Sequence, residues 1–173
     1  AHFAVTNPNS VTEMEDYKNS LSNNLVLEND VLIDFGPSVT PLPWNSHLPS
    51  LVNEYMDLKD SEGNETGIQL RVLGNYGYNE SGEQATTTSL NMPKSASTDS
   101  YWGNGLPFGE NVIPEVVIEI ANLNIEQKYV FTIFGSRAGS TDNRDTKYVL
   151  IGKNSDQLIL DTSSNKSNVV KSI

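Results

Sequence analysis

Residues Tyr129–Gly152 read YVFTIFGSRAGSTDNRDTKYVLIG and decide the fold class that the sequence predicts. Two apolar runs of strand type, YVFTIF and TKYVLIG, flank a polar loop that contains Arg137 and Arg144. Successive side chains of a strand point to opposite faces, and the first run places bulky residues on both. Such a strand belongs in the middle of a sheet rather than at its edge. We therefore expect a hydrophobic hairpin whose first run is a central strand of a β-sandwich.

The composition indicates one folded domain that is rich in turns. The chain has 173 residues, of which 36% are hydrophobic and 19% charged, and it carries seven Tyr, five Phe and two Trp. Disordered chains usually have more charge and fewer aromatic residues. No apolar run approaches the roughly 20 residues that span a bilayer, so no membrane association is expected. The N-terminus shows no signal-peptide pattern, and any leader is expected to have been removed.

The charge is negative and unevenly spread. The formal net charge is −11, and residues 1–66 hold eleven acids against only Lys18 and Lys59. A nucleic-acid partner is not expected, because such proteins show a basic stripe and none is visible. The chain has no cysteine, which excludes disulfides and thiolate metal sites without deciding the compartment.

Short strands separated by turn residues run from Asp30 to the end of the chain. Alternating apolar residues predict strands at Gly67–Leu73 and Tyr129–Phe134, and the other strands expected are Asp30–Gly36, Pro114–Leu123, Thr146–Gly152, Gln157–Asp161 and Ser167–Ile173. Leu51–Leu58 fits either a strand or a short helix, and Asp60–Gly67 is a turn. Residues 1–29 are predicted to be a mostly irregular lead-in that adds a strand at most.

Two segments are expected to be irregular. Residues 38–50 contain three prolines and are predicted to form a loop that presents Trp44, Asn45 and His47. Residues 91–114 form a second irregular region, and loops of that length are often functional. The whole pattern, eight or nine short strands with almost no helix, predicts an antiparallel β-sandwich of jelly-roll or Greek-key type over residues 30–173.

Several segments resemble a known kind of module. In chain order they are DVLIDFG, Trp44-Asn45, TDSYWGN, VVIEIANLNIEQKYVFTIFGSR, DNRDTKYVLIG and LILDTSSNKSNVV, and together they cover Asp30 to Ile173. This pattern is similar to the galactose-binding-like, carbohydrate-binding β-sandwich modules of bacterial extracellular proteins. Such modules are often attached to polysaccharide-degrading enzymes and esterases, particularly in marine and gut Bacteroidetes. The resemblance implies a secreted or surface location and a larger multidomain enzyme as parent.

The chain departs from that pattern at its end. The family usually continues through a Pro/Asp/Gly turn into a strand that closes the sheet, whereas this sequence stops at Ile173. The departure predicts either that the chain was trimmed or that another segment takes the position of the closing strand. Residues 1–29 are the candidate for this position, because an open central edge of a sheet invites aggregation.

Aromatic residues on polar, glycine-rich segments are the main candidates for ligand contact. Sugar C–H faces stack on exposed rings, so we expect at least one exposed platform, with core packing as the alternative for each ring. The candidates are Trp44, Tyr76, Tyr78, Tyr101, Trp102 and Phe108. Trp102 is the preferred one, with Asp99, Asn104 and Asn111 beside it to hydrogen-bond sugar hydroxyls.

Arg137 and Arg144 have two interpretations. An arginine fork binds hydroxyls, carboxylates or sulfates, but it also pairs with acids such as the adjacent Asp142 and Asp145. A sulfated ligand is expected only if both arginines converge with Arg71.

Calcium is the one cofactor considered. With only His2 and His47 as histidines and no cysteine, transition metals are not expected. The resembled sandwiches often carry a structural ion, for which the candidate ligands are Asp30, Asp34, Asp99 and Asp161, with a turn role as the alternative for each.

The sequence carries no signal for catalysis. A serine triad would need His47 as its base, and no G-x-S-x-G elbow exists. Glu115 and Glu119 share a strand face but lie about 13 Å apart by strand rise, too far for a glycosidase pair. The leading hypothesis is thus a non-catalytic module that binds a plant or algal polysaccharide. The alternatives are a structural or protein-interaction sandwich and a small β-sandwich lyase or hydrolase.

Overall fold

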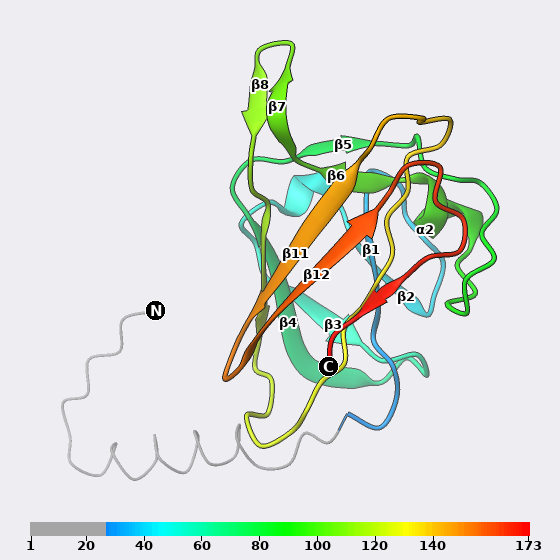
Figure 1. The fold of residues 1–173 in the computed structure, drawn as a ribbon. Coiled ribbons are helices and arrows are strands. Elements are labelled where there is room, and N and C mark those ends of the chain that lie inside the picture. The colour runs from blue at the N-terminus through cyan, green and yellow to red at the C-terminus, as the bar shows by residue number, and fades with distance from the viewer. Residues whose placement is uncertain (1–26) are drawn as a thin grey trace, which may run out of the picture.

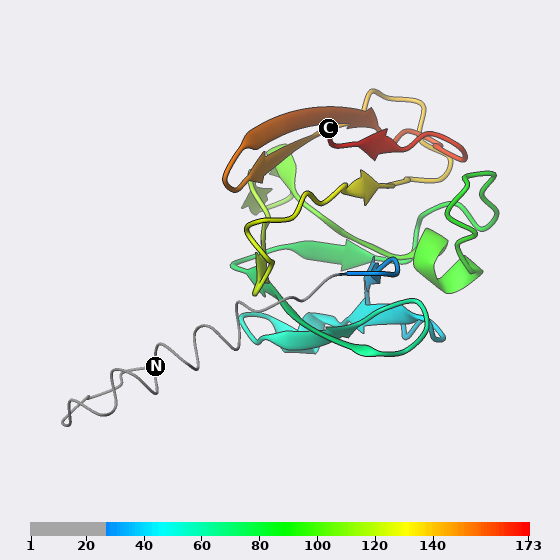
Figure 2. The same ribbon diagram turned by 90° about the horizontal axis from the view of Figure 1, so that it is seen from below.

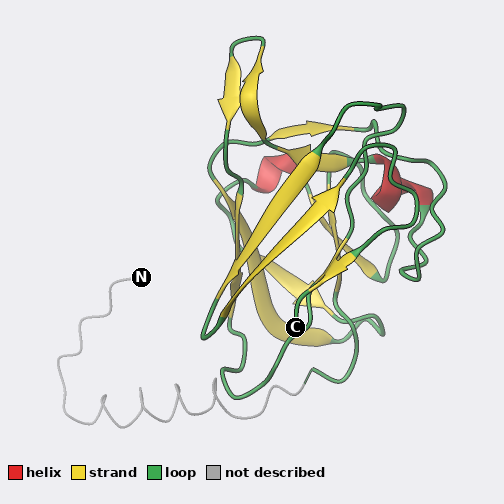
Figure 3. Ribbon diagram, viewed as in Figure 1, coloured by secondary structure: helices red, strands yellow, loops and turns green. Residues whose placement is uncertain are grey.

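A computed structural model of the chain describes residues 27–173, and the expectations for residues 1–26 lie outside this range. Strands and turns make up almost all of the described chain, as Figure 3 shows. The helical elements in this range are the single turns η1 (Pro49–Leu51) and α2 (Lys94–Thr98). The all-β prediction is therefore confirmed.

The strands of the described range are short and more numerous than expected. They are β1 (Leu32–Phe35), β2 (Trp44–His47), β3 (Met56–Lys59), β4 (Glu65–Leu73), β5 (Gly77–Asn79), β6 (Ser100–Trp102), β7 (Asn104–Phe108), β8 (Asn111–Ile113), β9 (Val117–Ala121), β10 (Thr132–Ile133), β11 (Asp145–Ile151), β12 (Ser155–Asp161) and β13 (Val170–Lys171). The expected strands at 30–36, 114–123 and 167–173 each contain one of these, and those at 67–73, 146–152 and 157–161 each overlap one that begins one or two residues earlier.

The core is organised around β4, the middle strand of the antiparallel sheet β3–β4–β9. Its side chains alternate between buried and accessible positions, so that Ile68, Leu70 and Val72 all face inward and are buried. Leu58 of β3 completes the buried cluster. Burying each of these side chains contributes about 1.5–3 kcal/mol, which makes this sheet the main stabilising layer.

A second layer lies across the first. The antiparallel hairpin β11–β12 crosses in front of β3 and β4 in Figure 1, and Figure 2 shows it with β13 on the side opposite the cyan β2–β3 region. β10 pairs with β13 in a separate two-stranded ladder. Two layers of mostly antiparallel strands with apolar side chains between them are consistent with a β-sandwich.

The prediction of a central strand at Tyr129–Phe134 is wrong. Only Thr132 and Ile133 form a ladder, and the flanking Val130 is 66% exposed. The hydroxyl of Tyr129 accepts a hydrogen bond from the backbone N–H of Asn124 at 2.9 Å, which holds this end of the run in a turn. The two runs therefore do not form a hairpin with each other, because β10 pairs with β13 and β11 with β12.

Residues 38–50 and 91–114 are more regular than expected. Residues 44–47, which lie between prolines but contain none, form β2 and pair with β1 in parallel register. Residues 94–113 contain α2, the strand β6 and the hairpin β7–β8, which projects from the body in Figure 1. Pro43 and Pro49 lie on either side of β2 and Pro93 precedes α2, whereas Pro107 lies within β7.

Candidate functional site

The strongest candidate site is a pocket at the start of β1 and β2, built around Trp44. The parallel register places Trp44 directly beside Leu32. The side chain of Asn45 fixes β2 in this position: its amide donates to the carbonyls of Leu32 (2.9 Å) and Lys59 (2.8 Å), and its oxygen accepts from Lys59 N–H (2.9 Å). One polar side chain thus holds β2 between β1 and β3 and sets the place of Trp44.

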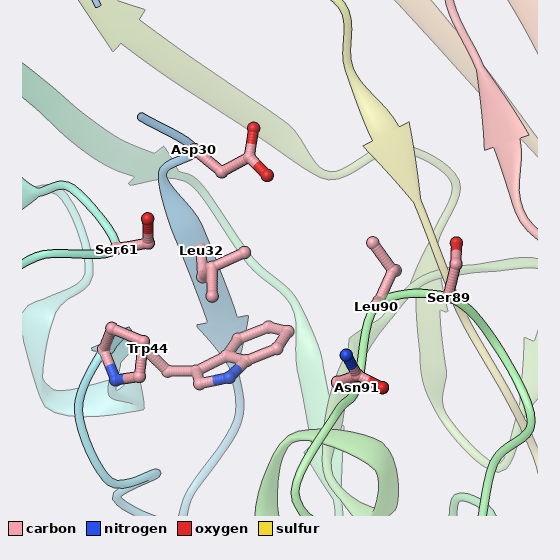
Figure 4. A pocket seen from close by; sticks show the side chains of 8 residues that line it. Asp30, Leu32, Trp44, Ser61, Ser89, Leu90 and Asn91 are labelled. Atoms are coloured by element: carbon pink, nitrogen blue, oxygen red, sulfur yellow. The ribbon is translucent and has the colours of Figure 1, made fainter. Parts of the chain in front are cut away.

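The Trp44 pocket has a volume of about 360 Å³, which is within the range of ligand pockets. Four separate segments of the chain form its walls, and Figure 4 shows the side chains that they contribute. Its apolar part is Leu32, Pro43, Trp44 and Leu90, and its polar part is Asp30, Ser61, Ser89 and Asn91. An indole surrounded by a carboxylate, an amide and hydroxyls can stack on an apolar ring face and hydrogen-bond the groups around it.

The wall that carries Asp30 and Ser61 is held by Asp60. Ser61 N–H donates to the Asp30 carbonyl at 2.7 Å. The Asp60 carboxylate accepts from the side-chain amides of Asn29 and Asn64 (both 3.0 Å) and from backbone N–H groups of its own turn. These hydrogen bonds lower the pKa of Asp60 from 3.8 to about 2, so a fixed negative charge stands behind this wall at neutral pH.

The opposite wall is the segment Ser89–Asn91, just before α2. Leu90 N–H donates to the Thr88 hydroxyl at 3.3 Å, and Asn91 has a positive φ of 47°, a conformation that asparagine adopts more readily than most residues. Upstream, Thr87 N–H donates to the Lys166 carbonyl at 2.8 Å, which ties the segment to the second layer. The long region 91–114 was expected to be functional, but Ser61 and Ser89 carry no sequence signal that marks them as pocket residues.

A buried pair of carboxyl groups lies next along the same face of β1. Leu32 and Asp34 are two residues apart, so their side chains leave one face about 7 Å apart along the strand. Asp34 accepts from the Thr40 hydroxyl at 2.6 Å and is hydrogen-bonded to Asp99, which accepts from Ser38 N–H at 2.9 Å. Both carboxyl groups are buried.

Both carboxyl groups of this pair have a raised pKa. Burial raises the pKa of Asp34 from 3.8 to about 7, and the charge of Asp99 adds to the effect. Burial also raises the pKa of Asp99, with Glu80 contributing. Among the described residues, Asp99 Oδ1 has no hydrogen-bond partner. A protonated Asp34 carboxyl group would have an O–H that can donate to Asp99. Neither carboxyl group lines the Trp44 pocket.

His47 packs beneath the acid pair in an aromatic cluster. The Tyr101 hydroxyl donates to the His47 carbonyl (2.6 Å) and so accepts from Nδ1–H of the ring (2.9 Å). Tyr76 stacks on Tyr101 with ring centroids 4.1 Å apart, and Phe35 packs against both His47 and Tyr101. Burial lowers the pKa of His47 and raises that of Tyr101, which keeps both groups neutral. These contacts place Tyr76 and Tyr101 in the core.

The surroundings of Trp102 differ from those of Trp44. Its indole lies directly on Gly77, where an added Cβ would overlap the ring, and meets Phe108 edge to face. Tyr78 on the neighbouring strand is 54% exposed. Asn104 uses its whole amide within the β7–β8 hairpin, where it donates to the Leu106 and Asn111 carbonyls and accepts from Ile113 N–H.

Arg137 and Arg144 flank the same residue, because Arg137 N–H donates to the Thr162 carbonyl (2.8 Å) and Thr162 N–H donates to the Arg144 carbonyl (3.3 Å), but Arg71 has other partners. Arg71 pairs with Glu119 on β9 and lies over the Tyr55 ring, 4.4 Å from its centroid. Arg144 pairs with Asp142 at 3.2 Å in the loop before β11. The backbone of Arg137 forms a bridge with that of Ser163. The condition that the sequence set for a sulfated ligand, convergence of all three, is not met.

The calcium candidates are dispersed. Asp30 lies on the pocket wall, Asp34 and Asp99 form the acid pair, and Asp161 accepts from the backbone N–H groups of Ser163 (2.9 Å) and Arg144 (3.4 Å). Within residues 27–173 no three histidine or acidic side chains gather in a metal-binding arrangement.

The chain matches no protein-family model, no curated protein and no solved structure. In the part that the structure describes, no helix is both long and apolar enough to cross a membrane. Its function is therefore inferred from the site itself.

Proposed function

We propose that this chain is a non-catalytic carbohydrate-binding module whose binding site is the Trp44 pocket. The observation that carries the proposal is the pairing of one indole with four polar side chains, Asp30, Ser61, Ser89 and Asn91, around one cavity. A pyranose ring presents an apolar C–H face and a rim of hydroxyls, which fits a pocket with one aromatic surface and a polar margin.

The proposal extends to the setting of the module. A secreted or surface protein that targets a larger enzyme to a polysaccharide, with its strands arranged as a jelly roll, accords with the resemblance in the sequence. A single shallow site of this kind predicts a Kd in the micromolar to millimolar range, which corresponds to about −8 to −4 kcal/mol.

Substitution of the two tryptophans tests the proposal. Affinity electrophoresis against a panel of plant and algal polysaccharides should show retardation of the wild-type protein by at least one of them. Trp44→Ala should abolish this retardation, and Trp102→Ala should leave it in place if the domain stays folded. If Trp102→Ala lost retardation and Trp44→Ala kept it, the binding site would have to be at Trp102 on β6. If no polysaccharide retarded the wild-type protein, carbohydrate binding would be refuted.

A protein-interaction module is the second candidate. It is favoured by the projecting hairpin β7–β8, on which Leu106, Phe108 and Val112 are exposed. Under this alternative, replacing these three side chains by serine would abolish a protein contact and leave polysaccharide retardation unchanged.

A further inference from the structure

Among the described residues, the lining of the Trp44 pocket includes one acid, Asp30, and no base. Asp30 is exposed on one wall, and none of the eight lining residues is Lys, Arg or His. Asp60 stands directly behind Ser61 on the same wall, and its carboxylate is held ionised by the amides around it. A ligand in the pocket therefore meets negative charge on this side.

The basic residues closest in sequence to the walls do not change this balance. Lys59 pairs with Glu65 at 2.9 Å and lines no part of the pocket. Lys94 is exposed on α2, three residues beyond Asn91, and is likewise absent from the lining.

This distribution discriminates among sugars by their charge. A uronic acid or sulfated sugar would bring a second anion next to Asp30 without a compensating cation. A protonated amine would instead meet a carboxylate, and a cation near an indole face is also attracted by the ring. The same pocket shape thus favours a cationic ring over a neutral one, and a neutral ring over an anionic one.

We propose that the Trp44 pocket selects a positively charged amino sugar, such as a glucosamine unit of a polysaccharide, with the ring against Trp44 and the ammonium group on Asp30. This inference rests on the proposed carbohydrate-binding function and adds the substrate class. Asp30 then determines the specificity, whereas Trp44 supplies the affinity common to all sugars.

Four β-1,4-linked tetrasaccharides of equal length provide the test: the tetramers of glucosamine, N-acetylglucosamine, glucose and glucuronic acid. Titration calorimetry at pH 6, where an amine is protonated, should rank glucosamine first and glucuronic acid last. Asp30→Asn should weaken binding of the glucosamine tetramer roughly tenfold and leave the glucose tetramer within about twofold.

A matched control separates the pocket from the overall charge. Glu110→Gln removes the same charge at the tip of the projecting hairpin, and it should leave the ranking and every Kd unchanged. If Glu110→Gln weakens glucosamine binding as much as Asp30→Asn does, the preference is a property of the whole acidic protein and the inference is overturned.

The remaining outcomes distinguish the inference from the function on which it rests. Binding of the glucose tetramer that depends on Trp44, with no preference for glucosamine, would overturn the amino-sugar inference and keep the carbohydrate-binding function. If neither these tetramers nor the polysaccharide panel binds, both fail.

Discussion

Replacing Asp34 by asparagine is expected to stabilise the protein, and to do so increasingly as the pH rises from about 4 to about 7. The Asp34 carboxyl group is buried, and its pKa is raised from 3.8 to about 7. The native state therefore holds this proton more tightly than the unfolded chain does. The stability linked to it is fully present below about pH 4 and is lost as the pH rises through about 7.

The size of the effect follows from the shift in pKa. One pKa unit corresponds to 1.36 kcal/mol, so a shift of about three units costs the wild-type protein about 4 kcal/mol at pH 8 relative to pH 4. The amide of Asp34→Asn can still accept from the Thr40 hydroxyl and donate to Asp99, as the protonated carboxyl group does. The substituted protein should be about as stable as the wild type at pH 4 and up to about 4 kcal/mol more stable at pH 8.

Urea unfolding followed by tryptophan fluorescence at half-unit steps from pH 4 to pH 8.5 measures this difference. The gap between the two proteins should open from about pH 4 and approach its full size at about pH 7, because this interval lies between the unfolded and the folded pKa of Asp34. Asp60, whose pKa is lowered, has the opposite dependence below pH 4 and is common to both proteins, so it cancels. Glu110→Gln, which removes an exposed charge, should follow the wild-type curve. Parallel curves for Asp34→Asn and the wild type at every pH would refute the assignment of a buried proton to Asp34.

Two further predictions concern the core and the pocket wall. Leu70→Ala should lower the free energy of unfolding by about 2–5 kcal/mol, because Leu70 is fully buried in the core beside β4. Leu106→Ala on the exposed hairpin should change it by less than about 0.5 kcal/mol. If urea unfolding gave equal losses for the two variants, the placement of the core would be contradicted. Asn45→Ala should cost about 1–3 kcal/mol and weaken sugar binding as well, because it removes the three hydrogen bonds that hold β2 to Leu32 and Lys59. In calorimetry, an unchanged Kd for this variant would show that Trp44 is positioned without Asn45.

The regular strands could be predicted because their signal is local. On β4 the apolar side chains at 68, 70 and 72 alternate with more polar ones, and this pattern by itself specifies a strand with one buried face. The strands β11 and β12 contain the continuous apolar runs YVLI and LIL, and the predicted ranges 146–152 and 157–161 overlap them. The segment 129–134 has equal apolar content but forms only a two-residue ladder, because pairing depends on which other segment reaches it.

The candidate site could be predicted only in part. Trp44 and Asp30 were both candidates, for a sugar and for a metal respectively, and the structure brings them to one pocket. Asn91 joins them from the start of the irregular region 91–114, for which a function was expected, whereas nothing in the local sequence of Ser61 or Ser89 marks these two residues. The preference for Trp102 came from its polar neighbours, but the amide of Asn104 is used within its own hairpin.

The sequence by itself determined that this chain is all-β, acidic and without cysteine chemistry, since alternation, net charge and composition need no knowledge of distant contacts. The tertiary structure alone decided that β2 pairs in parallel with β1, that Asp34 meets Asp99 across 65 positions of sequence, and that one pocket forms at Trp44. The physical reason is that strand formation is encoded in neighbouring residues. Strand pairing, the burial of a carboxyl group and the enclosure of a cavity depend instead on segments that only the folded chain brings together.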